Sequence, residues 1–194
     1  MEKDSELSEL YEYSKIMSEV KLVRWNELPS FPVYADQLLQ IVKDQLSFLQ
    51  IGDENLITKS MVNNYVKWGM IPKPVKKKYE KLHILSVIVI TMLKQVLPIA
   101  KIKDGIKLQV ALLGNEERAY DSFCEAFEES MHLTFMPILQ KQNPYLLEER
   151  EIKYEKLAIS SITMSLSSKL LTEKIIEVKN KKYLSQDNYS KGEK

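Results

Sequence analysis

The chain has 194 residues, a formal net charge of +1, 44% hydrophobic residues and 28% charged residues. This composition excludes a wholly disordered chain, and five glycines leave little room for a turn-rich all-β fold. The single cysteine, Cys124, excludes an internal disulfide and agrees with a reducing compartment. We therefore expect an all-α fold.

No segment of the sequence is typical of membrane insertion or secretion. The densest apolar run, residues 82–97, is interrupted by polar side chains and is too short to span a bilayer. The first ten residues are acidic and lack the basic start and apolar stretch of a secretory signal. We expect a cytoplasmic protein without membrane contact.

Apolar residues at helical spacing predict the first two helices. Residues 5–22 form an amphipathic pattern with acids between the apolar positions, although such a helix could also be frayed. Residues 26–32 contain two prolines and are expected to connect this helix to a second one over residues 34–50. The polar segment 52–55 is expected to end the second helix.

A third, short helix is delimited by residues with strong preferences for helix ends. Thr58 is a favourable N-cap, Gly69 suits a left-handed C-terminal position, and Pro72 and Pro74 prevent the helix from resuming. The face expected to meet the core consists of Met61, Val62, Tyr65 and Val66. The opposite face is small, amide and cationic, and consists of Lys59, Ser60, Asn63, Asn64 and Lys67.

The second and third helices, joined by a short turn, have the arrangement of a helix-turn-helix. In that motif the second helix enters the major groove of DNA. Amide, hydroxyl and ammonium groups are the side chains that contact base edges and phosphates. The polar face of the third helix is therefore a candidate DNA-reading surface.

Charge is distributed unevenly along the chain. Residues 1–55 carry a formal charge of −6, residues 56–103 carry +9, and residues 104–194 carry −2. A concentrated cationic segment attracts polyanions whatever the overall balance. The alternative is an ordinary solvated lysine face, because a lysine run alone proves little.

Four further helices are predicted after the basic segment. Residues 81–96 form an apolar run whose β-branched centre is typical of a strand, but its length favours a helix. The next helix ends at Gly114, and Asn115 begins another. A last long helix is expected to end near Tyr183 and to form a helical hairpin with its predecessor. Small serines in it would permit close packing and a dimer seam, although the apolar spacing is not that of a coiled coil.

These elements divide the chain into four parts. Residues 1–32 are an N-terminal helix with its linker, and residues 33–113 are a helix-turn-helix domain. Residues 114–184 are a C-terminal helical hairpin able to dimerise, and residues 185–194 are a disordered tail.

Part of this pattern resembles the DNA-binding domain of MerR-type regulators, in which a small wing follows the helix-turn-helix. The similar residues are Thr58, Tyr65, Gly69, Met70, Ile71, Lys77, Tyr79, His83, Ile84 and the stretch 97–102. The span from Trp25 through Asp36-Gln37 to Tyr79 also resembles an uncharacterised bacterial family, domain of unknown function 1836. The MerR resemblance implies groove-facing residues at Lys59, Asn63 and Lys67, and DNA-backbone contacts at Lys76, Lys77, Lys78 and Tyr79.

The chain also departs from the MerR pattern. Ser60, Asn63 and Asn64 stand where those regulators usually present arginines and paired tyrosines. The segment 73–78 lacks a glycine and is too short for a full glycine-tipped hairpin, so we expect a simple basic loop in place of the wing.

Residues for catalysis are scarce. The chain has two histidines, one cysteine and no glycine-rich phosphate loop, so we expect neither an enzyme nor a cofactor. Glu129 and His132 have the spacing of a di-iron bundle ligand pair, but such a site needs a second copy, which only a dimer could supply. We expect the acids of this helix to solvate its face, Cys124 to act as a small hydrophobe, and His83 to pack or cap a helix.

Two functions remain. The first is sequence-specific binding of duplex DNA in transcriptional control, as a homodimer that addresses half-sites one helical turn apart. The second is a protein-interaction module that has the helix-turn-helix shape without binding DNA. Neither an effector ligand nor an operator follows from the sequence.

Overall fold

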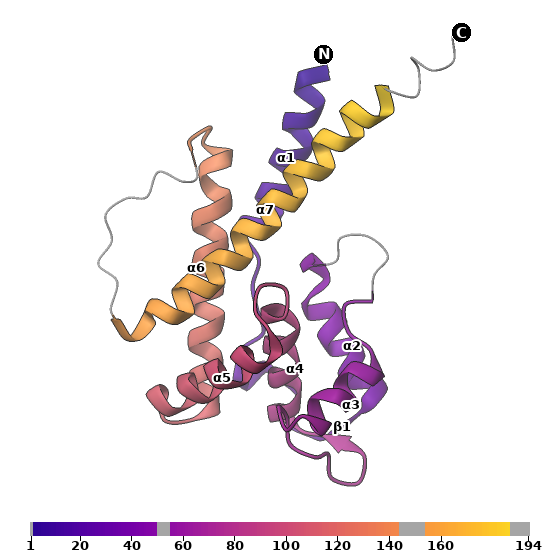
Figure 1. The fold of residues 1–194 in the computed structure, drawn as a ribbon, viewed down its shortest axis with the longest axis vertical. Helices are drawn as coiled ribbons and strands as arrows, with labels where there is room; N and C mark the ends of the chain where they lie inside the picture. Colours follow the sequence, from indigo (N-terminus) through magenta and orange to yellow (C-terminus); the bar gives the residue numbers. More distant parts are fainter. Residues whose placement is uncertain (1, 50–54, 144–153, 187–194) are drawn as a thin grey trace.

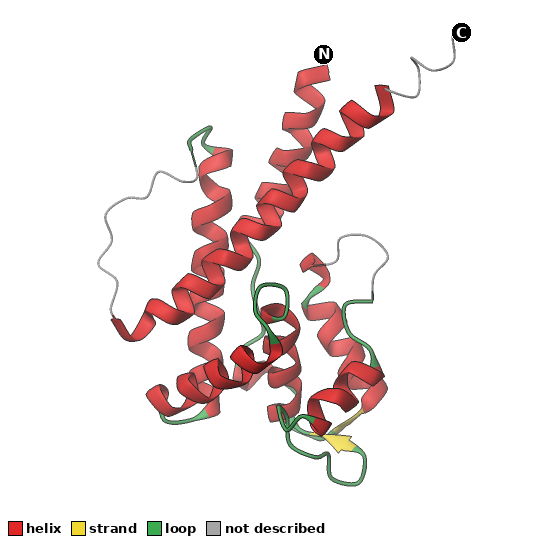
Figure 2. Ribbon diagram, in the orientation of Figure 1, coloured by secondary structure: helices red, strands yellow, loops and turns green. Residues whose placement is uncertain are grey.

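A computed structural model of the protein describes residues 2–49, 55–143 and 154–186. These residues form mostly α-helix, as expected, with one small sheet (Figures 1 and 2). The helices are α1 (Glu2–Ser18), α2 (Ala35–Gln45), α3 (Lys59–Lys67), α4 (Lys81–Leu93), α5 (Ile99–Leu113), α6 (Glu116–Leu139) and α7 (Leu157–Gln186). The strands are β1 (Val33–Tyr34) and β2 (Lys78–Tyr79), and short 3-10 helices cover Trp25–Glu27, Ser47–Leu49 and Tyr154–Lys156.

Helix α4 is the centre of the fold. Every side chain from His83 to Leu93 is buried, and the helix contacts α2, α5, α6, α7 and β2. A helix that is apolar on all sides is stable only when it is surrounded by protein. The β-branched run in α4 is therefore helical, as its length predicted, because neighbouring helices cover each of its faces.

Local sequence signals set several helix ends as expected. The Thr58 side chain accepts a hydrogen bond from the Met61 N–H at 3.2 Å, and the Asn115 side chain accepts one from the Arg118 N–H at 2.9 Å. Gly69 and Gly114 have φ of +63° and +89°, a left-handed conformation that glycine adopts readily. The predicted ends of α3 and α5 and the start of α6 are thus confirmed.

The expected hairpin of the last two helices is wrong, because α6 and α7 run in the same direction. The hydroxyls of Ser130 and Thr163 share a hydrogen bond of 2.8 Å, and those of Thr134 and Ser167 share another of 2.8 Å. In both pairs the residue of α7 follows the residue of α6 by 33 positions. A constant separation of this kind occurs in parallel helices, whereas in antiparallel helices the separation would shrink as α6 advances.

The N-terminal helix packs against these C-terminal helices and is antiparallel to both (Figure 1). The Tyr11 hydroxyl donates to the Leu139 carbonyl, and the rings of Tyr13 and Phe135 meet edge to face at 5.7 Å. Glu9 accepts hydrogen bonds from Lys174 and Lys181, each at 2.7 Å. Helices α1, α6 and α7 therefore form one three-helix unit, although α1 is far from the others in sequence.

Some expectations fall outside the described residues. These are the polar stop over residues 52–54 and the tail beyond residue 186. Helix α7 continues through Gln186, so the first two residues assigned to the tail are helical. Within the described part of the chain, no helix is both long and apolar enough to cross a membrane.

Candidate nucleic-acid interface

Helices α2 and α3 pack through a shared core but are not joined by a short turn. Leu38 and Val42 of α2 are buried in the same cluster as Val62 and Tyr65 of α3. The connection occupies residues 46–58, whereas a helix-turn-helix uses roughly three or four residues. The expected short turn is therefore wrong. The connection is longer because α2 ends at Gln45 and the following 3-10 helix places Leu49 in the core.

Helix α3 divides into the two faces that its sequence predicted. Val62 and Tyr65 are buried, and Met61 and Val66 are half-buried against the core. The exposed residues of the polar face are Lys59, Ser60, Asn63 and Lys67, with Asn64 half-buried at its edge. Hydroxyl, amide and ammonium groups of this helix are therefore accessible from outside.

The basic loop after α3 is a hairpin, which corrects the expectation of a simple loop. Val33 pairs with Tyr79 and Tyr34 pairs with Lys78 in an antiparallel sheet. The Lys78 N–H donates to the Val75 carbonyl at 2.9 Å, closing a two-residue turn. The two turn residues, Lys76 and Lys77, have φ of +50° and +61°, as a type I′ turn requires. The sequence did not predict this turn because lysine rarely adopts positive φ.

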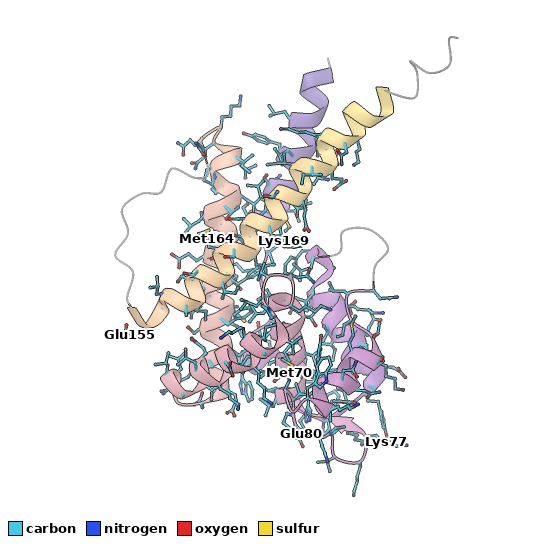
Figure 3. All side chains as sticks on the ribbon, viewed as in Figure 1. Met70, Lys77, Glu80, Glu155, Met164 and Lys169 are labelled. Carbon is cyan, nitrogen blue, oxygen red and sulfur yellow. The ribbon has the colours of Figure 1, made fainter. Side chains whose placement is uncertain are left out.

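The hairpin places its lysines at one end of the molecule. Lys76, Lys77 and Lys78 are exposed, and Lys77 lies on the outer loop beyond the strands (Figure 3). Helix α3 lies at the same end (Figure 1). The sequence thus brings the polar helix face and the lysine cluster to one region of the surface.

Tyr79 does not belong to the exposed cluster. It is only 6% exposed, and its ring meets the ring of His83 edge to face at 5.5 Å. Successive side chains of a strand point to opposite faces, so Tyr79 points inward where Lys78 points outward. Burial also raises the pKa of Tyr79. Its assignment as a DNA-backbone contact is therefore wrong, and it anchors the hairpin to α4.

Exposed aromatic residues beside the lysines were missed in the sequence. Tyr34 is 57% exposed, and the Lys78 ammonium lies 5.3 Å from the centre of its ring. Phe31, just before β1, is also largely exposed. Tyr34 and Lys78 are opposite each other in the sheet, so their side chains share its outer face. Only the pairing of β1 with β2 identifies this contact.

Two lysines of the basic segment are engaged with the protein. The Lys94 ammonium donates to the Leu56 carbonyl at 2.7 Å, and burial lowers its pKa. Lys103 of α5 donates to the Trp68 carbonyl at 2.9 Å, just after the end of α3. These two residues connect the ends of α3 to the rest of the protein, and the partly buried Lys94 contributes less to the surface charge than an exposed lysine would.

His83 caps the start of α4. Its Nδ1 accepts a hydrogen bond from the Glu80 N–H at 3.0 Å, and its ring is buried. Burial lowers the pKa of His83. The residue has the packing and capping role that the sequence suggested.

Two acids of α6 were wrongly expected only to solvate the helix face. Glu128 is 8% exposed and accepts hydrogen bonds from Arg24 at 2.6 and 2.9 Å, from Lys21 at 2.9 Å and from the Leu22 N–H at 3.0 Å. Asp121 accepts one from the Trp25 N–H at 2.9 Å. Both carboxylates bind the segment that follows α1, which no local pattern in α6 could indicate.

The remaining residues of α6 that were considered for chemistry differ in exposure. Cys124 is buried, and burial raises its pKa to about 12, as befits a small hydrophobe. Glu129 and His132 are exposed. Among the described residues, no three histidine, cysteine or carboxylate side chains are grouped as ligands for a metal ion.

The positive φ of the two turn residues leads to a prediction about stability. Replacing Lys76 with asparagine and Lys77 with glycine is expected to raise the free energy of unfolding by about 1 kcal/mol, because these residues adopt positive φ with less strain. Urea denaturation followed by circular dichroism measures the change. Lys78→Asn, at an extended strand position, is the control and should not stabilise. If the Asn-Gly variant were less stable than the unaltered protein, the assignment of a type I′ turn to residues 76 and 77 would be wrong.

Comparison with known proteins places the chain in a family. A family model described as a domain of unknown function (DUF1836) matches residues 23–127, more than half of the chain. No curated protein matches the chain, and no solved structure matches it. The matched span contains α2 to α5, the hairpin and the first half of α6. The chain belongs to the DUF1836 family.

Proposed function

We propose that the protein binds duplex DNA and acts in transcriptional control, with α3 in the major groove and the hairpin on the phosphate backbone. In this proposal α2, α3, the hairpin at residues 75–78 and the small β1–β2 sheet form a MerR-like reader with an extended link and a minimal wing. The residues that contact DNA are Lys59, Ser60, Asn63 and Lys67 of α3 and Lys76, Lys77 and Lys78 of the hairpin, with Asn64 at the edge of the surface.

The observation that carries this proposal is the conformation of Lys76 and Lys77. Both have positive φ at an exposed turn, where asparagine and glycine are strongly preferred. A non-glycine residue in the left-handed region is disfavoured by about 1–2 kcal/mol. Strain of this kind clusters at functional sites. A phosphate-binding role accounts for lysine at these two positions. Binding of their ammonium groups to phosphate would compensate for the backbone strain, which asparagine and glycine would avoid.

The distribution of charge supports the same surface. Residues 56–103 contain ten lysines and a single acid, Glu80. Removing the inward-directed Lys94 still leaves a strongly cationic region around α3 and the hairpin. Lysine contacts with phosphate supply most of the affinity in non-specific DNA binding and position the reading helix.

We further propose that the protein acts as a homodimer, because helix-turn-helix readers commonly address two half-sites. Ile16 of α1 and Ile176 of α7 are exposed apolar side chains on two helices that pack together. They suit a contact between two copies. A role on DNA also requires the cytoplasmic location expected from the sequence.

A second candidate function is protein binding without DNA. It is favoured by the exposed apolar side chains beside the lysines, namely Phe31, Tyr34 and Val75. Aromatic residues with neighbouring cations are enriched in protein interfaces as well as in nucleic-acid sites. Salt dependence separates the two candidates.

The test is a fluorescence-anisotropy titration with mixed-sequence duplex DNA at 50 and 200 mM salt. Five lysine–phosphate contacts per chain predict a loss of affinity of about 10²- to 10³-fold between these conditions for each chain bound. The Lys76→Asn, Lys77→Gly variant keeps the turn and removes two charges. It is expected to reduce the slope of log affinity against log salt by about two. Light scattering on the same complexes gives the number of protein chains bound.

The control removes two charges elsewhere. Lys15 of α1 and Lys179 of α7 are exposed, and their replacement by glutamine should leave the slope unchanged. An equal change in both variants would mean that only total charge matters. Binding that is absent, or independent of salt, would favour the protein-interaction module. Asn63→Ala separates base reading from phosphate contact, because loss of a bidentate pair with a base weakens discrimination between sites by about 1–3 kcal/mol.

A further inference from the structure

Three large exposed side chains lie in or beside the lysine hairpin, and the proposed duplex contact makes no use of them. Phe31 is 64% exposed, Tyr34 is 57% exposed and Val75 is 65% exposed. Burial of aromatic and branched side chains stabilises a fold, so a surface where several of them stay exposed together is a candidate contact site.

Strand pairing places a lysine between two of these side chains. Lys78 is paired with Tyr34 of β1 on one side and with Val75 on the other. Residues that are directly opposite in an antiparallel sheet project from the same face. Tyr34, Lys78 and Val75 therefore form a row across the sheet, which we call the outer row. The Lys78 ammonium lies 5.3 Å from the centre of the Tyr34 ring, so the ring and the charge belong to one surface.

Phe31 extends this surface along the chain. It lies three residues before Tyr34, so their Cα atoms are at most about 11 Å apart. More than half of each side chain is exposed, so both rings keep surface for a further contact beside the lysines.

The charge around the outer row fits a polyanion. Residues 73–81 contain five lysines, and the exposed acids next to the sheet in sequence are Glu27, Asp36 and Glu80. The lysines are the majority, and Lys77 lies on the outer loop of the hairpin (Figure 3). A cationic surface of this kind attracts phosphate groups.

Exposed rings beside lysines match an unpaired strand better than a duplex. The bases of a duplex stack on one another, so a ring on the outside meets only sugars and phosphates. An unpaired strand offers its phosphates to the lysines and the faces of its bases to the rings. Proteins that bind single strands combine these two elements, a cationic surface and aromatic side chains on which bases stack.

We propose that Phe31 and the outer row bind single-stranded DNA, with bases stacked on Phe31 and Tyr34 and phosphates bound by the hairpin lysines. Phe31 and Val75 have no hydrogen-bonding group for the 2′-hydroxyl of RNA, so DNA is the preferred strand. This activity shares the hairpin lysines with the proposed duplex contact but makes no use of α3.

The test is fluorescence anisotropy of the full chain with a labelled oligothymidylate of about twelve nucleotides. An abasic oligomer of the same length is the matched probe, because it has the same phosphates without the bases. The unaltered protein is expected to bind oligothymidylate at least about tenfold more tightly than the abasic oligomer. Tyr34→Ala and Phe31→Ala should each weaken oligothymidylate binding by about 5- to 150-fold and leave abasic binding unchanged.

Three further variants test the role of the rings. Tyr34→Phe keeps the ring and should retain oligothymidylate binding. Trp68→Ala removes an aromatic side chain that is 48% exposed outside the outer row, and it should change neither affinity. Asn63→Ala alters only the proposed reading of duplex DNA, so it should leave oligothymidylate binding unchanged. If Tyr34→Ala does not fold, Phe31→Ala carries the test, since Phe31 lies outside the strands.

Several results would overturn the proposal. They are equal binding of oligothymidylate and the abasic oligomer, a loss in the two ring variants no larger than in Trp68→Ala, and no binding of either strand, which would favour an acidic protein as the occupant. Oligouridylate binding as tightly as oligothymidylate would overturn the preference for DNA. A failure of the duplex proposal is separate from these outcomes, because no duplex is present in the measurement.

Discussion

Replacing Glu128 with glutamine is expected to lower the free energy of unfolding by about 3 kcal/mol. Glutamine has nearly the same size but lacks the charge that binds Arg24 and Lys21. Arg24 is 29% exposed and donates two hydrogen bonds to Glu128, so it would lose a counter-charge in a partly dry environment. The Leu22 N–H would also compete for a weaker acceptor. The loss should therefore exceed that of an ordinary surface ion pair.

Urea denaturation followed by circular dichroism measures this effect, with the denaturant dependence of the two proteins compared to exclude a change in the unfolded state. Glu125→Gln is the matched control, because Glu125 is exposed on the same helix. The control should change stability by less than about 0.5 kcal/mol. Similar losses in both variants would show that the buried contact with Arg24 is not formed.

The pH dependence of the Glu128 effect has a definite sign. Burial alone would raise the pKa of Glu128, but the hydrogen bonds from Arg24, Lys21 and Leu22 outweigh it and leave the pKa below its ordinary value. A carboxyl with a lowered pKa in the folded state contributes stability above its unfolded pKa and loses it as the pH falls through its folded pKa. The difference between the two proteins should therefore be full at pH 7 and shrink below about pH 4.5. A difference that grows on acidification would contradict the assignment.

Replacing Ile88 with alanine is expected to lower the free energy of unfolding by about 3 kcal/mol. Ile88 is 0% exposed in α4, the helix around which both parts of the protein pack. Removing its outer carbons leaves a space that rigid helices on several sides cannot fill. The loss combines the transfer of apolar groups with the energy of the cavity.

Leu112→Ala removes the same number of carbon atoms at the surface of α5, where the side chain is 51% exposed. Its effect on unfolding should stay within about 0.5 kcal/mol. Both variants are compared by thermal melting and by urea denaturation. Equal effects would mean that α4 is not surrounded by its neighbours, and the arrangement of the whole core would have to be revised.

Several features followed from the sequence because they depend on neighbouring residues alone. Thr58 and Asn115 accept hydrogen bonds from backbone groups three residues away, and Gly69 and Gly114 need only their own freedom at positive φ. The two faces of α3 follow from a period of about 3.6 residues. Such signals are complete within one helix, so the fold class and the exposed polar face of α3 were predictable.

Other features depended on residues that meet only after folding. The sheet joins Val33 to Tyr79, and this pairing decided that Tyr79 is buried while Lys78 is exposed. Residues 31–34 therefore belong to the candidate interface, although in sequence they resemble a linker. Lys76 and Lys77 have positive φ, which contradicts the local preference of lysine. For these reasons only part of the candidate site was predictable.

The sequence alone determined a helical chain with defined helix ends, a buried central helix and a basic segment beside a polar helix face. Tertiary structure alone decided that α6 and α7 are parallel, that Glu128 binds Arg24, and that β2, at the end of the basic loop, pairs with β1. The physical reason is the separation along the sequence of the residues that interact. Capping and helical periodicity act over a few residues, whereas helix direction, buried ion pairs and strand pairing depend on contacts between residues about 30 to 100 positions apart, which no local pattern records.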